Sequence, residues 1–354
     1  MLVDGRALYN GNEFRGIGVY LRSLLAELVL MDEFELHVLA PRSVSLPAGV
    51  ARVPVRRLLR NKYSPLEHEA LLPGEIRRFR PDLYHSPAQE PPRRCDAPWV
   101  QTLHSVDDHP ALGAVQERWR GLAERVRRAA GVMVASAHAG RGVAELLGLD
   151  AARVHVAPHG VDPIFRPPGG PRLSDPPYLL YVSEYGPHKG YPEAFEAVSR
   201  LAERGYPHEL RVAGRMLPWV EPEVRALVAQ AGRPDRIRLL GYVPRPDLVR
   251  QYQAATAVVL SSRCEAFGLT AVEAMATGTP LVAFANTALP EVIGGGGVMV
   301  SDGDVGAMTE ALITLIDDPS ASAETARRGV ARAAEFTWHR SAMRHADVFR
   351  RLAG

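Results

Sequence analysis

Short apolar runs alternate with helical patterns from end to end of this chain, and they constrain its fold more than any other feature. Runs of four or five apolar residues between turn signals are typical of strands buried on both faces, and intervening helices favour parallel βαβ units. The sequence therefore predicts an α/β fold with a parallel sheet in each half. We expect strands at residues 36–40, 83–85, 99–103, 132–135, 178–182, 209–213, 237–240, 257–260 and 280–284.

Length and composition indicate a soluble protein with two domains. The 354 residues are enough for two units that each bury a core, and 46% hydrophobic with 23% charged residues is ordinary for a globular protein. A net charge of +2 without a recognition motif argues against nucleic acid as a partner. The sequence contains no apolar run of membrane-spanning length and no signal-peptide pattern at its start, so we expect a cytoplasmic protein.

Two cysteines, Cys95 and Cys264, are the only ones in the sequence. They are too few and too far apart for a disulfide framework or a metal cluster. We therefore expect two reduced thiols and no metal site.

A basic segment at residues 118–128 carries five arginines, with Trp119, Leu122 and Val126 between them. Such a segment could make weak peripheral contact with an anionic membrane. A solvated helix face is the simpler interpretation, and it is the one that charge patterning favours.

A cluster of proline and glycine at residues 165–171 marks the predicted domain boundary. Neither helical nor strand periodicity can continue through it. We therefore expect one domain at residues 1–165, a second at residues 166–335 and a terminal helix at residues 336–354.

Two glutamates lie around the start of a predicted helix in the second half. Glu265 follows a buried-strand pattern, a helix is predicted at residues 269–277, and Glu273 lies one turn inside that helix. Beyond the carboxyl ends of parallel strands, helix N-termini offer unpaired N–H groups to phosphate. A carboxylate can also accept two hydrogen bonds from the hydroxyls of a ribose. The pattern predicts a polar ligand at this edge of the sheet.

Glu265 and Glu273 have seven residues between them, and Phe267-Gly268-Leu269 follows the first. This spacing resembles the E-x7-E signature of retaining nucleotide-sugar glycosyltransferases of family 4, and residues 277–283 and 288–293 continue the resemblance. It implies the GT-B architecture, in which two doubly wound Rossmann-like domains face each other across a cleft and a terminal helix crosses back onto the first. It also implies that Glu273 holds the donor ribose, that Glu265 contacts the donor sugar and that Phe267-Gly268-Leu269 lines the donor site.

Three further segments resemble loops of the same family. Residues 157–162 resemble its interdomain segment, with His159 in place of an asparagine. Residues 181–190 resemble its phosphate loop, in which Lys189 would neutralise charge on the departing nucleoside diphosphate. His104 follows a predicted strand, as the histidine of the family's cleft loop does, and the resemblance implies that it hydrogen-bonds the donor sugar.

The remaining candidates for the donor site are weaker. Gly16 and Gly18 open a helical pattern and resemble the first βα loop, where backbone N–H groups can approach an oxyanion. Tyr242 and Val243 resemble the segment that meets the nucleotide base. His85 ends another predicted strand and is a candidate for the acceptor side.

The phosphate loop also departs from the family pattern. Ser183 and Glu184 stand where relatives often carry a glycine and a phosphate-binding arginine. Because a carboxylate would repel a diphosphate, either Glu184 points away or the alignment shifts in this turn. Arg263 is a candidate for the missing charge.

The combined prediction is a retaining, metal-independent hexosyltransferase that uses a nucleoside diphosphate sugar, with His104, Lys189 and Glu265 as catalytic residues. The second domain would bind the donor, and the first would meet an acceptor hydroxyl on a glycan, a lipid or a natural product, through loops such as residues 61–65. Two alternatives remain open: a sugar phosphorylase or epimerase on the same fold, and a silent sugar-nucleotide sensor or scaffold. The nucleotide base, the sugar and the oligomeric state are not decided.

Overall fold

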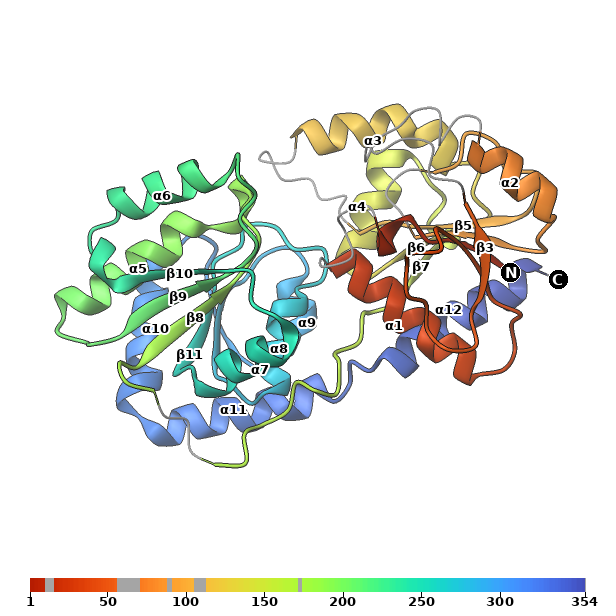
Figure 1. Ribbon diagram of the computed structural model, residues 1–354. Helices are drawn as coiled ribbons and strands as arrows, with labels where there is room; N and C mark the ends of the chain where they lie inside the picture. The colour runs from red at the N-terminus through yellow and green to blue at the C-terminus, as the bar shows by residue number, and fades with distance from the viewer. Residues whose placement is uncertain (10–15, 56–70, 88–90, 105–112, 171–173, 354) are drawn as a thin grey trace. The chain divides into compact units, whose positions relative to one another are not determined.

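The computed structural model describes residues 1–9, 16–55, 71–87, 91–104, 113–170 and 174–353 (Figure 1). The predicted acceptor loop at residues 61–65 lies outside these ranges. Contacts divide the chain into two compact units, Met1–Gly160 with Thr337–Gly354 and Val161–Phe336. Each unit is built on its own sheet.

Unit 1 contains a seven-stranded parallel sheet with the order β3-β2-β1-β4-β5-β6-β7. Its strands are β1 (Leu2–Asp4), β2 (His37–Ala40), β3 (Ala51–Pro54), β4 (Tyr84–Ser86), β5 (Trp99–Thr102), β6 (Gly131–Val134) and β7 (Val154–Val156). Its helices are α1 (Gly16–Leu30), α2 (Leu72–Phe79), α3 (Gly113–Val126), α4 (Ala137–Leu147) and α12 (Trp338–Ala353).

The last helix of the chain, α12, completes the core of unit 1. It packs beside α1, which comes more than 300 residues earlier, and both contribute to one apolar cluster (Figure 1). The buried positions of α1 recur every three or four residues, which is the pattern of a helix with one face on a core. At the start of α12, a Cβ on Gly160 would lie 2.1 Å from the backbone nitrogen of Trp338, so only glycine fits there.

Unit 2 contains a six-stranded parallel sheet with the order β10-β9-β8-β11-β12-β13. Its strands are β8 (Tyr178–Val182), β9 (Glu209–Ala213), β10 (Ile237–Gly241), β11 (Ala257–Leu260), β12 (Leu281–Phe284) and β13 (Val298–Val300). Its helices are α5 (Tyr191–Glu203), α6 (Glu221–Gln230), α7 (Arg245–Ala254), α8 (Leu269–Ala276), α9 (Leu289–Ile293), α10 (Val305–Asp317) and α11 (Pro319–Ala333).

The strand order of unit 2 reverses at β8. The chain moves from β8 to β9 and β10 on one side, then returns to β11, β12 and β13 on the other. Because parallel crossovers are right-handed, this reversal puts α5 and α8 on opposite faces of the sheet. Unit 2 is therefore doubly wound, and its switch point lies between β8 and β11.

The structure confirms all nine predicted strands to within one residue at either end, and the described ranges contain four more. The additional strands β1, β3, β7 and β13 are only three or four residues long. Three of them, β3, β7 and β13, form sheet edges, and their residues are mostly half-buried or exposed. Each of these three strands is too short or too polar to carry the run of four or five apolar residues that reveals a buried strand.

The first domain boundary lies five residues before the predicted one, between 160 and 161 instead of between 165 and 166. The reason is Phe165, which is buried in unit 2. Its ring meets Tyr252 edge-on at 5.7 Å between centroids and lies under the guanidinium of Arg245. The second boundary lies between 336 and 337, one residue later than predicted.

Among the helices of the described ranges, none combines the length and apolarity needed to cross a bilayer. In the basic segment, Val126 is fully buried, and Arg127 donates to the carbonyl of Leu147 and to the carboxylate of Glu124. The side chains of Arg118 and Trp119 lie outside the description. Weak membrane contact through this segment stays a prediction.

Candidate functional site

Two loops on either side of the switch point carry the main candidates. One follows β8 and contains a 3-10 turn, Pro187–Lys189, before α5 begins. The other follows β11 and contains Glu265 before α8 begins. Because β8 and β11 are neighbours in a parallel sheet, both loops leave the same edge, which is where open α/β sheets bind ligands.

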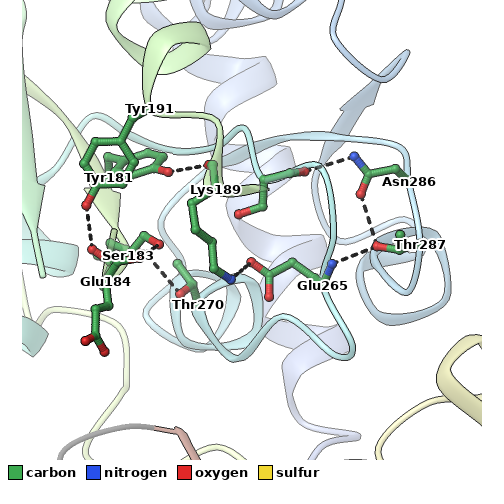
Figure 2. A network of polar contacts seen from close by, with 11 residues as sticks. Tyr181, Ser183, Glu184, Lys189, Tyr191, Glu265, Thr270, Asn286 and Thr287 are labelled. Atoms are coloured by element: carbon green, nitrogen blue, oxygen red, sulfur yellow. Dashed lines mark hydrogen bonds and ion pairs between the residues drawn. The ribbon is translucent and has the colours of Figure 1, made fainter. Parts of the chain in front are cut away.

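Lys189 and Glu265 meet across these loops. The Nζ of Lys189 donates to Oε1 of Glu265 at 2.7 Å, as Figure 2 shows. The side chains are 22% and 16% exposed, so the ion pair is largely shielded but remains within reach of a ligand. At this edge, the ammonium can also attract an anion, and the carboxylate beside it can accept hydrogen bonds from hydroxyl groups.

The turn that carries Lys189 is held on several sides. The backbone N–H of Lys189 donates to the carbonyl of Gly186 at 2.9 Å, and the carbonyl of Lys189 accepts a hydrogen bond from the hydroxyl of Tyr181 (Figure 2). Gly190 follows with a φ of +73°, and a Cβ there would lie 1.9 Å from the carbonyl oxygen of Ser261. Only glycine permits this close approach to the loop after β11.

The predicted Phe267-Gly268-Leu269 segment leads into α8. Gly268 has a φ of +91°, which favours glycine, and Leu269 is the first residue of the helix. The ring of Phe267 is 4% exposed and meets Phe336 edge-on at 5.6 Å between centroids. This ring packs in the interior, so it offers no stacking surface to a ligand.

Glu273 lies in the second turn of α8 with a buried carboxylate. Tyr252 donates its hydroxyl to Oε2 at 3.1 Å, and Nη1 of Arg245 lies 4.0 Å from Oε1. Burial raises the pKa of Glu273 to about 7, although Arg245 and the Tyr252 hydrogen bond oppose the rise. A carboxylate at this pKa exchanges its proton in the physiological range.

Arg245 and Tyr252 are parts of the site that our sequence interpretation missed. Both belong to α7, and Arg245 is held in place by Asp162, whose carboxylate accepts from Nη2 at 3.2 Å. The sequence signal that could have found them is that α7 begins just after Tyr242 and Val243, the residues predicted to meet the nucleotide base. Nothing in the local pattern, however, indicates that these side chains turn toward Glu273.

If this site binds a nucleotide, as the family resemblance implies, replacing Arg245 with glutamine is expected to make that binding more dependent on pH. Arg245 is the charge that most favours the ionised form of Glu273, whereas Asp162 disfavours it. Without the guanidinium, the pKa of Glu273 rises further and less carboxylate is present at pH 7. We expect affinity about tenfold lower at pH 7 and largely recovered at pH 9.

The measurement is calorimetric titration with UDP between pH 6 and pH 9. Arg250→Gln is the matched control, because Arg250 is an exposed arginine of the same helix that pairs with Asp247. Its pH profile should follow the wild type. A profile for Arg245→Gln that coincides with the wild type would show that Arg245 does not tune Glu273.

The departures in the phosphate loop have a structural explanation. Glu184 points away from Lys189 (Figure 2), and its carboxylate lies 3.7 Å from Arg215. Arg263, our candidate for the missing charge, instead bonds to Glu193 at 2.7 Å and lies 3.3 Å from Asp302. Its guanidinium is thus engaged by two carboxylates, and a role for Arg263 at a phosphate stays a prediction.

His104 lies in unit 1 at the end of β5. Its Nε2 lies 3.1 Å from the carbonyl of Pro87, and its ring meets Tyr20 edge-on at 4.7 Å between centroids. Burial lowers the pKa of His104 to about 4, so the ring is neutral at pH 7. Because a carbonyl can only accept, the proton is on Nε2, and Nδ1 is left as an acceptor for a hydroxyl group.

His85, our candidate for the acceptor side, is fully buried. Its Nε2 bonds to the hydroxyl of Thr102 at 2.8 Å, and its ring packs against Phe349. A side chain in the core cannot line an acceptor site, so this expectation was wrong. Neither cysteine forms a disulfide in the described ranges, and Cys264 is a buried apolar residue.

The other candidates lie at element ends. Gly16 is the first residue of α1 and Gly18 lies in its first turn, while the preceding residues 10–15 are outside the described ranges. Tyr242 is 49% exposed just after β10, and Val243 is partly buried. Within the described ranges, no group of three or more His, Cys, Asp or Glu side chains could hold a metal ion.

Comparison with known proteins decides the family. The family model "Glycosyltransferase Family 4" matches residues 14–165, and "Glycosyl transferases group 1" matches residues 168–334. The chain is a family 4 glycosyltransferase. The glycogen synthase of Mycobacterium tuberculosis strain H37Rv is 30% identical over 303 residues, which are 78% of this chain and 70% of that protein.

Two other similarities bear on this glycosyltransferase. O-antigen chain mannosyltransferase B of Escherichia coli is 33% identical over 178 residues, 49% of this chain and 46% of that protein, so the match spans about half its length. Anabaena Alr3699/HepE, solved in complex with UDP-glucose, superimposes with a TM-score of 0.77 at 18% identity, covering 99% of both chains. The latter likeness shows the fold, which is the GT-B fold with two Rossmann-like domains.

Proposed function

We propose that this glycosyltransferase moves a hexosyl group from a nucleoside diphosphate sugar to an acceptor hydroxyl with retention of configuration. The ion pair of Lys189 with Glu265, 2.7 Å apart beside the switch point, is the observation that carries the proposal. An ammonium there can neutralise the departing diphosphate, and the carboxylate can hold sugar hydroxyls. The UDP-glucose complex of Alr3699/HepE supports a donor of this class.

The roles of the candidate residues follow their chemistry. Glu273 accepts hydrogen bonds from the ribose, Glu265 from the donor sugar, and Lys189 stabilises the diphosphate together with backbone N–H groups. Nδ1 of His104 accepts a hydrogen bond from a hydroxyl of the donor sugar. The family resemblance assigns the base to Tyr242 and Val243, and additional phosphate contacts to the amides at Gly16 and Gly18.

The proposed step breaks the bond between the anomeric carbon and the diphosphate oxygen while the acceptor oxygen attacks from the same face. The departing phosphate oxygen takes the acceptor proton, so charge and protons balance without another base. Lys189 supplies the positive charge in this scheme, and no metal ion takes part. The acceptor is a hydroxyl of a glycan, a lipid or a natural product.

Thermal unfolding with UDP, GDP, ADP and dTDP tests the donor site, in the wild type and in Glu273→Ala. A ligand that binds only the folded state raises the temperature at the midpoint of unfolding. At a hundredfold excess over Kd, it adds about 2.7 kcal/mol to the free energy of unfolding. We expect one nucleotide to stabilise the wild type more than the variant. If none does so at millimolar concentration, the donor assignment is refuted.

Turnover separates an enzyme from a sensor of the same ligand. Incubating the protein with the sugar conjugate of the stabilising nucleotide and a panel of acceptors should release free nucleoside diphosphate. NMR of the product would report the anomeric configuration. Tight binding with no release for any acceptor would favour a sensor.

A further inference from the structure

Thr287 has a backbone conformation that threonine rarely adopts. It lies in the turn between β12 and α9, and its φ is +45°. This left-handed region suits glycine, whereas a β-branched side chain there is strained. Such strain persists only where surrounding contacts hold it, and strained residues concentrate at functional sites.

The turn holds both polar groups of the Glu265 backbone. Oγ1 of Thr287 accepts the N–H of Glu265 at 2.9 Å, as drawn in Figure 2, and the N–H of Ala288 donates to the carbonyl of Glu265 at 3.2 Å. With its backbone held at both groups, Glu265 can move its carboxylate only by rotation about side-chain bonds. That carboxylate pairs with Lys189.

Asn286 orients the threonine hydroxyl. Thr287 donates to Oδ1 of Asn286 at 3.2 Å, and Nδ2 of Asn286 donates to the carbonyl of Ser262 at 2.9 Å and to Asp302 at 2.6 Å. Since Ser262 belongs to the same loop as Glu265, the two residues 286 and 287 join the loop after β12 to the loop after β11 (Figure 2).

We propose that Thr287, oriented by Asn286, is a positioning residue that sets where the Glu265 carboxylate meets the donor sugar. The inference rests on the proposed function of Glu265 as the residue that holds that sugar. Glycine would fit the φ of this position without strain, but it would lose the hydroxyl that binds the Glu265 N–H. The strained threonine is explained by this bond.

Three substitutions separate the effect of the Thr287 hydroxyl from the effect of its backbone conformation. T287V removes the hydroxyl and keeps the branched shape, T287G relieves the φ, and T287S keeps the oxygen. Calorimetry with UDP-glucose should show about three- to tenfold weaker binding for T287V and T287G, the scale of one hydrogen bond, and recovery in T287S. Binding of UDP alone should stay within about twofold of the wild type in all three, because Glu265 is assigned to the sugar.

Hydrogen exchange at the Glu265 amide tests the positioning without any ligand. We expect faster exchange in T287V and T287G and near wild-type exchange in T287S. T309V is the matched control, because it removes a buried threonine hydroxyl, bonded to the carbonyl of Val305 in α10 of the same unit. It should leave Glu265 exchange and UDP-glucose binding unchanged.

The T287G variant also distinguishes positioning from stability. Its unfolding midpoint should be maintained or raised, since glycine suits the φ, while UDP-glucose binds more weakly. Unchanged exchange at Glu265 in T287V would overturn the inference, and so would equal losses of UDP and UDP-glucose affinity. A wild type that binds neither ligand would instead refute UDP-glucose as donor, and the exchange result would still decide the role of Thr287.

Discussion

Replacing Lys189 with alanine is expected to lower kcat/KM for sugar transfer by about two orders of magnitude, the scale of losing one charge-stabilising group in a transition state. The ammonium lies beside Glu265 at the edge where a diphosphate would lie, and the turn that carries it is fixed by Tyr181 and Gly190. Negative charge on the diphosphate grows as the sugar departs. The loss should therefore fall mainly on kcat, measured from steady-state release of nucleoside diphosphate.

Two variants control for this prediction. Lys189→Arg keeps the charge on a larger, planar group and should retain part of the activity. Arg204→Ala removes an exposed ion pair with Glu310, 2.6 Å long, from the same unit, and should stay within about twofold of the wild type. Wild-type kinetics for Lys189→Ala would remove Lys189 from the mechanism.

Glu273→Gln should weaken nucleotide binding and stabilise the free protein at the same time. Binding should weaken by about 10- to 100-fold, the scale of hydrogen bonds from a ribose to a charged group. Burial raises the pKa of Glu273 to about 7, so the folded state holds this proton more tightly than the unfolded state. Below pH 4.5, the ordinary pKa of this carboxyl, the group is protonated in both states and does not lower the free energy of unfolding. As the pH rises from 4.5 to about 7, the unfolded state loses the proton first, and the free energy of unfolding falls.

Urea unfolding at pH 5 and pH 8 measures this effect. Glutamine carries no charge, so at pH 8 we expect the variant to exceed the wild type by about 1–3 kcal/mol, with a much smaller difference at pH 5. Glu221→Gln is the matched control, since Glu221 is an exposed carboxylate that pairs with Arg225 in α6. A difference between variant and wild type that is the same at both pH values would contradict the pKa of Glu273.

The longer strands in the middle of a sheet were predictable, whereas β1, which is fully buried but has only two apolar residues before Asp4, was missed. The strands β8, β9 and β11 match the predicted residues 178–182, 209–213 and 257–260 because each is a continuous apolar or mostly apolar run in the middle of a sheet. The edge strands β7 and β13 escaped because each is only three residues long, whereas the edge strand β10, with five residues, was predicted. The apolar pattern therefore can fail for strands that are too short to carry a run of four or five apolar residues.

The candidate site was predictable in its residue types and not in its partners. Glu265 and Glu273 were identified from their spacing and from resemblance, and Lys189 from resemblance. The same pattern suggested His85 and Arg263, which the structure places in a core and in an ion-pair network. A local pattern cannot distinguish a strand-end histidine in the core from one at the surface.

By itself, the sequence determined the family and the α/β class and singled out the two glutamates and the lysine as candidates, because these depend on local periodicity and on short motifs. Only the tertiary structure decided that Lys189 meets Glu265 across 76 residues, that Arg245 and Tyr252 face Glu273, and that Glu184 turns away. It also decided that Thr287 holds the Glu265 backbone. These contacts join loops from different strands, and which loops meet is set by strand order and packing, which no single segment of sequence encodes.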